Sequence, residues 1–144
     1  MIAVDTNILV YAHRAELPKH GAALARLTEL AESSEVWAIP AFCLGEFARV
    51  ITHPKLFDPP HSPREAAGAI ERLTASPSLR ILNPGPRFPA LFGEAIRAAE
   101  AKGNLVYDAQ IVAVCREVGA RRLLTEDRDF DRFPGFATAR LAPV

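Results

Sequence analysis

Short apolar runs alternate with longer amphipathic segments along the whole chain. The short runs predict β-strands at residues 2–4, 36–39, 79–82 and 122–125, with a fifth strand at 136–141 on the sheet edge. Between them, apolar residues recur at helical spacing in a short segment after residue 5, then at 20–32, 40–51, 63–74, 88–102 and 106–118. This alternation predicts an α/β fold, with a central, mostly parallel sheet of four to five strands and helices on both faces.

The residues between these segments are typical of helix ends. Ser62 and Pro63, followed by Glu65, predict a capped helix start. Pro54 ends the segment 40–51, and Gly119 ends the segment 106–118. No repeat, low-complexity stretch or linker interrupts the 144 residues, so we expect one domain covering residues 1–144.

Composition narrows the class of protein. Hydrophobic residues make up 49% of the chain and charged residues 24%, as in ordinary globular proteins. No apolar run is long enough for a membrane span, and no basic leader precedes Asp5, so we expect a cytoplasmic protein. Cys43 and Cys115 lie in apolar helical segments, which favours small buried thiols over a disulfide.

Basic and acidic residues balance at 17 each. A net charge of zero argues against a protein that wraps nucleic acid non-specifically, because such affinity comes from neutralising phosphates. It does not exclude an enzyme that contacts nucleic acid briefly at an acidic, metal-loaded site.

Four acidic residues lie at positions where a parallel α/β fold often places functional side chains. Asp5 and Asp127 follow the first and fourth predicted strands, and the carboxyl ends of parallel strands meet at one sheet edge. Asp108 opens a helix that is otherwise nearly all apolar, and Glu46 lies in the apolar segment 40–51. Clustered carboxylates without matching cations need a proton or a metal ion among them. Oxygen ligands favour Mg²⁺ or Mn²⁺, and two such ions can hydrolyse a phosphodiester with an activated water.

Several short runs, taken in order, carry a resemblance to a known family. Asp5-Thr6-Asn7, Glu46, the run 103–109 around Asp108 and the run 125–130 around Asp127 resemble the PIN domain. More narrowly, with the runs 51–54 and 129–135, the chain is similar to VapC-type toxins of bacterial toxin–antitoxin pairs. The resemblance covers essentially the whole chain. It implies a PIN-like three-layer fold and an Mg²⁺-dependent endoribonuclease in which Mn²⁺ can substitute, usually homodimeric and silenced by a cognate VapB-type antitoxin.

The resemblance also implies roles for individual residues. Its catalytic quartet falls on Asp5, Glu46, Asp108 and Asp127, with Asp5, Asp108 and Asp127 as metal ligands. Four further residues are expected to support them. Thr6 or Asn7 would orient Asp5 through its side chain, and Thr125 would do the same near Asp127. Asp129 would either bind metal through a water or cap the turn before Phe130, and the turn is favoured.

The antitoxin is expected to lay a helix in an apolar groove of the segments 20–32 and 40–51 and to place a basic side chain among the acids.

Other interpretations stay open at this point. Asp5 could simply be a turn residue after a strand, since the run Asp-Thr-Asn is common in turns, and Glu46 could be an exposed acid on a helix. A catalytically inactive PIN-like module that binds RNA or protein is the main alternative function. A phosphatase of the haloacid-dehalogenase type needs a second aspartate where Asn7 stands, and a response-regulator receiver needs a late lysine in the sheet that is not visible.

Overall fold

Five parallel strands form the centre of the protein. The computed structural model describes residues 1–143. The strands are β1 (Ile2–Val4), β2 (Trp37–Pro40), β3 (Leu79–Leu82), β4 (Arg122–Leu124) and β5 (Thr138–Ala139), in the spatial order β3-β2-β1-β4-β5. All four neighbouring pairs are parallel. The predicted α/β sheet is confirmed. The edge strand β5 is shorter than the predicted 136–141, because Arg140 and Leu141 turn to contact the loop after β4.

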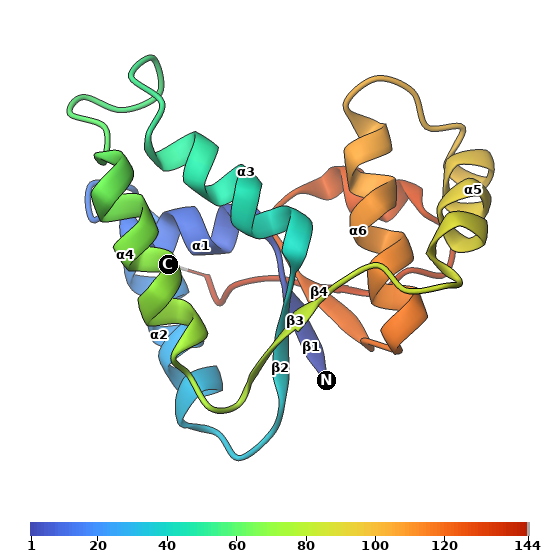
Figure 1. Ribbon diagram of the computed structural model, residues 1–144, viewed down its shortest axis with the longest axis horizontal. Helices are drawn as coiled ribbons and strands as arrows, with labels where there is room; N and C mark the ends of the chain where they lie inside the picture. The colour runs from blue at the N-terminus through green and yellow to red at the C-terminus, as the bar shows by residue number, and fades with distance from the viewer. Residues whose placement is uncertain (144) are drawn as a thin grey trace.

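Helices cover both faces of this sheet. They are α1 (Thr6–His13), α2 (His20–Glu32), α3 (Ala41–Ile51), α4 (Pro63–Thr74), α5 (Phe88–Ala99) and α6 (Leu105–Val118), and a 3-10 helix, η1 (Arg128–Arg132), follows β4. Helices α1 to α4 lie on one side of the sheet, and α5 and α6 lie on the other (Figure 1). This is the three-layer arrangement that the sequence predicts.

The change of face follows from the strand order. The chain moves from β1 through β2 to β3 in one direction, then returns to β4 on the other side of β1. Right-handed crossovers in opposite directions place their helices on opposite faces. The gap between the two sets of helices therefore opens at the carboxyl ends of β1 and β4, where open α/β sheets bind their ligands. The residues that follow these two strands begin with Asp5 and Thr125.

One helix boundary differs from its prediction by more than one residue. The segment 88–102 forms a helix only as far as Ala99, because Glu100 takes the left-handed backbone conformation with φ of 49°. The N–H of Ala101 then bonds to the carbonyl of Ile96, which closes the helix end. The sequence offers Gly103 as the stop signal, since a residue other than glycine rarely adopts this conformation.

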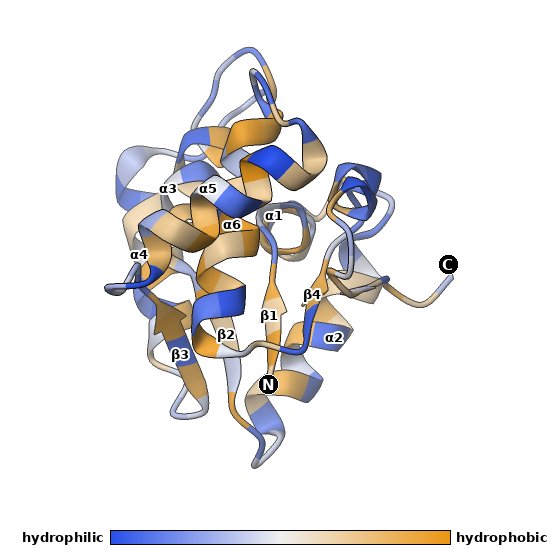
Figure 2. Cartoon of the chain, turned by 90° about the vertical axis from the view of Figure 1, so that its right-hand side faces the viewer, coloured by the Kyte–Doolittle hydropathy of each residue, from blue (hydrophilic) through white to orange (hydrophobic). Residues whose placement is uncertain are grey.

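Apolar side chains from both layers meet on the sheet. Helix α3 buries Cys43, Phe47 and Ile51 at four-residue spacing, and α6 buries every residue from 111 to 115. Figure 2 shows hydrophobic residues along β1 and β3 and over much of α6. Cys43 and Cys115 are both buried and free, as predicted. Among residues 1–143, no helix is long and apolar enough to cross a membrane.

The start of α4 provides a test of local stability. Ser62 accepts the Glu65 N–H, and the Glu65 carboxylate accepts the Ser62 N–H, each at 3.0 Å. Ser62→Ala removes one half of this capping box, so we expect the free energy of unfolding in urea to fall by about 1 kcal/mol. Ser34→Ala, at an exposed position outside any helix, serves as the control. Equal stability of the two variants would contradict the assignment of this cap.

Candidate functional site

Asp5 stands at the carboxyl end of β1, and its carboxylate is held from four directions. Its side chain is almost fully buried, with the residue only 4% exposed. One oxygen accepts the Thr6 N–H at 2.8 Å and faces the Cys43 thiol at 3.7 Å. The other oxygen accepts the Thr125 hydroxyl at 2.7 Å and the Asn7 amide at 3.0 Å. These four donors match the lone pairs of an ionised carboxylate, so they fix its orientation.

Thr125 and Asn7 tie the ends of β1 and β4 together. While the Thr125 hydroxyl donates to Asp5, it accepts the Asn7 amide at 3.1 Å and the Asp127 N–H at 3.0 Å. The Asn7 carbonyl oxygen accepts the Glu126 N–H at 3.2 Å. Every hydrogen-bonding position of the Thr125 hydroxyl is therefore used. Asn7 rather than the Thr6 side chain orients Asp5, and Thr125 contacts both aspartates.

Glu46 reaches the same place from α3. It precedes the buried Phe47 and so flanks the apolar stripe of the helix. Its carboxylate accepts the Thr6 hydroxyl at 3.2 Å, which links α3 to the start of α1. Glu46, Asp5, Asp108 and Asp127 all line one pocket of about 240 Å³. Four separate elements thus bring the predicted quartet together, and we call this space the acidic pocket.

Asp127 and Asp129 divide their roles differently from the prediction. Asp127 caps η1 by accepting the Asp129 N–H at 2.9 Å, so the turn cap predicted for Asp129 belongs to Asp127. This leaves the Asp129 carboxylate available. Asp108, Asp127 and Asp129 each offer a carboxylate oxygen, and these oxygens lie within 4.8 Å of one another. Asp5, the remaining predicted ligand, is not part of this group of three but lines the same pocket as Asp108 and Asp127.

Burial makes ionisation unfavourable for two members of the quartet. It raises the pKa of Asp5 from 3.8 to about 6, against the stabilising hydrogen bonds of Thr125 and Thr6. It raises the pKa of Asp108 to about 7, and the neighbouring charges of Asp127, Asp5, Asp129 and Glu46 add to the effect. The site therefore carries excess negative charge that a proton or a cation relieves.

The donor set fits a divalent cation with oxygen ligands. Within residues 1–143, no lysine or arginine forms an ion pair with a member of the quartet or with Asp129. Carboxylate oxygens at this spacing suit Mg²⁺ or Mn²⁺, whereas zinc sites generally include histidine or cysteine ligands.

Sequence reasoning missed one residue that positions the site. Arg140 donates to the carbonyl of Thr125 at 2.7 Å and to the carbonyl of Asp127 at 3.2 Å, and it pairs with Asp131 at 3.3 Å. It therefore fixes the loop between β4 and η1, which ends in Asp127. A lone arginine after a two-residue strand gives no signal in the sequence, since only the fold brings it to this loop.

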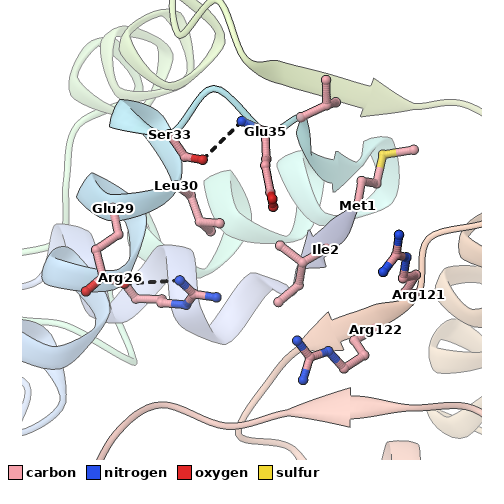
Figure 3. A pocket seen from close by; sticks show the side chains of 10 residues that line it. Met1, Ile2, Arg26, Glu29, Leu30, Ser33, Glu35, Arg121 and Arg122 are labelled. Carbon is pink, nitrogen blue, oxygen red and sulfur yellow. Dashed lines mark hydrogen bonds and ion pairs between the residues drawn. The ribbon is translucent and has the colours of Figure 1, made fainter.

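A second cavity, of about 420 Å³, lies at the other end of the sheet. It is lined by Met1, at the start of β1, and by Arg121 and Arg122, at the start of β4 (Figure 3). Arg26 also lines it and pairs with Glu29 at 3.0 Å. Arg121 and Arg122 lie at the amino end of β4 and Arg26 comes from α2, and none of the three lines the acidic pocket.

Comparisons with known proteins agree in family and in fold. The model of the PIN domain family matches residues 2–135. Ribonuclease VapC43 of Mycobacterium tuberculosis is 38% identical over 133 residues, which is 92% of this chain and 90% of the relative. Ribonuclease VapC31 of the same organism is 32% identical over 134 residues, covering 92% of this chain and 93% of the relative.

Two solved structures share the fold at lower identity. VapBC2 from Rickettsia felis, bound to a DNA fragment from its promoter, superposes with a TM-score of 0.73 at 21% identity, covering 99% of this chain and 100% of that chain. VapC20 of Mycobacterium tuberculosis, a sarcin–ricin loop cleaving toxin, gives a TM-score of 0.69 at 24% identity, covering 95% of this chain and 97% of that chain.

The raised pKa of Asp108 predicts how stability depends on pH without metal. Between pH 4 and 7 the unfolded chain releases this proton while the folded chain keeps it, so the free energy of unfolding falls as pH rises. Asp108→Asn removes that loss, and the Asp108 side chain makes no hydrogen bond within residues 1–143 that the change would break. In EDTA, we expect the variant to be more stable than the wild type at pH 8 but not at pH 4, measured by urea unfolding.

The matched control is Glu94→Gln, which removes one exposed acid from α5. It should leave the difference between pH 4 and pH 8 unchanged. If Asp108→Asn shows the same pH dependence as the wild type, the site does not carry the strain that the buried carboxylates imply.

Proposed function

The chain belongs to the PIN-domain family, in its VapC group, and from this premise we propose that it is a metal-dependent endoribonuclease toxin, with residues 1–144 forming a single PIN domain. One observation carries the proposal. Asp5, Glu46, Asp108 and Asp127, from four different elements, line one pocket at the sheet edge where α/β folds bind ligands. Under this proposal the substrate is RNA, the activity is cytoplasmic and the working form is a homodimer, as the family resemblance implies.

The cofactor is Mg²⁺, and Mn²⁺ can substitute. Asp108, Asp127 and Asp129 would hold it, since their oxygens lie within 4.8 Å of one another and lack a paired cation among the described residues. When bound, such an ion lowers the pKa of a coordinated water and neutralises charge on the phosphodiester. Asp5, the third predicted ligand, lines the same pocket as Asp108 and Asp127, so its carboxylate would join them at the cation.

The chain's own residues supply rigidity and orientation. Thr125, Asn7 and the Thr6 N–H hold the Asp5 carboxylate in one position. The Thr6 hydroxyl holds Glu46 in the same pocket, where its carboxylate can accept a proton from a water. Because these groups are fixed before substrate binds, little reorganisation is needed during the reaction.

The partner is a VapB-type antitoxin. The solved relatives from Rickettsia felis and from Haemophilus influenzae are described as VapBC, which supports such a pairing for this chain. An apolar groove of about 220 Å³ lies between α2 and α4 and includes Leu24, Leu27, Ala31 and Leu73. It suits the apolar face of a helix. The sequence predicts a groove formed by the segments 20–32 and 40–51. The groove found in the structure shares the first of these segments, as α2, and has α4 in place of the second.

A test of catalysis follows from the acidic pocket. Asp108→Asn and Glu46→Gln each remove one charge while keeping side-chain size. We expect cleavage of RNA in Mg²⁺ to fall about 100-fold or more, because each carboxylate acts on the cation or the water at the reacting phosphate. Product formation on a denaturing gel measures the rate. Glu94→Gln, the same chemical change on an exposed face of α5, should cleave at the wild-type rate.

The choice of variants separates chemistry from folding. Asp5→Asn is a poorer test, because its amide would face the donors Asn7 and Thr125 and disturb the fold. Cleavage by Asp108→Asn at the wild-type rate would refute the catalytic role of the pocket. A wild-type protein that binds RNA but never cleaves it in Mg²⁺ or Mn²⁺ would favour the inactive binding module.

A second prediction concerns the antitoxin groove. Leu24 is 47% exposed on α2 and lines the groove, so Leu24→Asp places a charge where an apolar helix should pack. We expect the affinity for the antitoxin encoded beside this chain to fall about tenfold or more, with cleavage by the free toxin unchanged. Surface-immobilised binding assays measure the affinity. Leu56→Asp, at a residue 55% exposed in the loop after α3, is the control. Equal binding by both variants would place the antitoxin elsewhere.

A further inference from the structure

A larger cavity adjoins the acidic pocket and has no role in the chemistry described so far. Its volume is about 800 Å³, and it shares Glu46, Asp108 and Asp127 with the acidic pocket. Beyond the acids, its lining includes Arg49 from α3 and Tyr107 from α6. A molecule that reaches the acids from this side must pass these two side chains. We call this space the side cavity.

The polar lining of the side cavity is not engaged in holding the fold together. Arg49, Asn104, Tyr107 and Gln110 make no side-chain hydrogen bond or ion pair within residues 1–143. Tyr107 is 64% exposed and is the most exposed of the large apolar side chains. By contrast, nearly every polar side chain around Asp5 has a partner. A set of unpaired donors and one open aromatic ring beside a reactive centre is typical of a ligand site.

Helix geometry aligns these groups with the acids. Tyr107 directly precedes Asp108 and lies three residues after Asn104, so the three lie close together at the start of α6. On α3, Phe42, Glu46 and Arg49 are spaced by four and three residues and share one face. The aromatic ring therefore lies on one side of the cavity and the guanidinium on the other.

The chemistry of the two side chains selects a ligand class. An exposed tyrosine ring can stack on any nucleobase, and arginine binds phosphate through a planar set of donors. A base inside a duplex is already stacked on both sides, so it is not free for such a contact. Arg121 and Arg122 lie at the opposite end of the sheet, so they cannot contact an RNA segment that lies beside Tyr107 and Arg49.

We propose that the side cavity binds the single-stranded RNA segment next to the cleaved phosphodiester, with Tyr107 stacking on a nucleobase and Arg49 binding a phosphate. This inference rests on the proposed ribonuclease function and adds two residues, Tyr107 and Arg49, that bind the substrate. Tyr107 and Arg49 contribute to substrate binding, whereas the acids act on the reacting phosphate.

The first experiment separates stacking from other roles of Tyr107. The probe is a labelled single-stranded oligoribonucleotide of mixed sequence, alone or annealed to its complement, with Mg²⁺ present. We expect the wild type to cleave the single strand and spare the duplex. Tyr107→Leu should raise KM about tenfold or more with little change in kcat, whereas Tyr107→Phe should behave like the wild type, because the ring is kept.

The second experiment tests the contact from the RNA side. After the cleavage position is mapped, the base on either side is removed to give an abasic site. The abasic site that faces Tyr107 should raise KM for the wild type but not further for Tyr107→Leu, since the contact is already lost. Arg49→Gln should weaken binding and reduce its dependence on salt by about one phosphate contact. Arg97→Gln, at an exposed position on α5, is the matched control.

The outcomes show separately whether the side cavity binds RNA and whether the protein is a ribonuclease. If Tyr107→Leu and the wild type cleave with the same KM, or if the duplex is cleaved as well as the single strand, the side cavity is not the RNA site, while the ribonuclease function stands. If Tyr107→Leu changes the oligomeric state by light scattering, the ring belongs to an interface between copies and the inference is overturned. If the wild type cleaves no RNA in Mg²⁺ or Mn²⁺, the proposed function itself fails.

Discussion

The hydrogen bonds between the ends of β1 and β4 are the constraint on which the site depends. A buried carboxylate is costly unless donors surround it, and Asp5 has four of them. Two of these, Thr125 and Asn7, also bind each other and the backbone of the next two residues after Thr125. The same network therefore fixes both the Asp5 carboxylate and the backbone position of Asp127, which in turn holds Asp129. These acids cannot move independently.

This rigidity explains why the acidic pocket favours a cation. Carboxylates on flexible loops would separate until their repulsion faded. Here Asp108 is held by the buried helix α6, and Asp127 by the cap of η1 and by the clamp of Arg140. The cost of keeping them close appears in the raised pKa values of Asp108 and Asp5. A divalent ion that binds the folded state alone offsets that cost, which couples metal binding to stability.

The fold also separates the surfaces that the proposed function needs. The acidic pocket and the side cavity open between α3 and α6, at the carboxyl edge of the sheet. The apolar groove between α2 and α4 lies on the helical layer that packs against α1. Under the proposed function, a partner helix in that groove would not itself contact the acids. Control of the activity would then come from a segment of the partner that extends toward the acids, where a basic side chain would replace the cation.

By itself, the sequence determined the fold class and the four acidic positions. Short, mainly apolar runs that alternate with segments of helical spacing leave few arrangements other than a parallel sheet between helices. Asp5 and Asp127 stand directly after strands, so their shared edge follows from strand direction alone. Helix α2 was predicted with its observed bounds, because its apolar spacing and flanking breakers are local signals.

Only the tertiary structure decided which oxygens face one another. Asp127 and Asp129 are two residues apart, and the sequence cannot tell which caps η1 and which stays free, because both are good turn residues. The partners that hold the Asp5 carboxylate come from positions as distant as Cys43 and Thr125, so the sequence could not show them. Arg140 and the side cavity depend on contacts between segments far apart in the chain. Such contacts are set by packing, and no local pattern of residues encodes them.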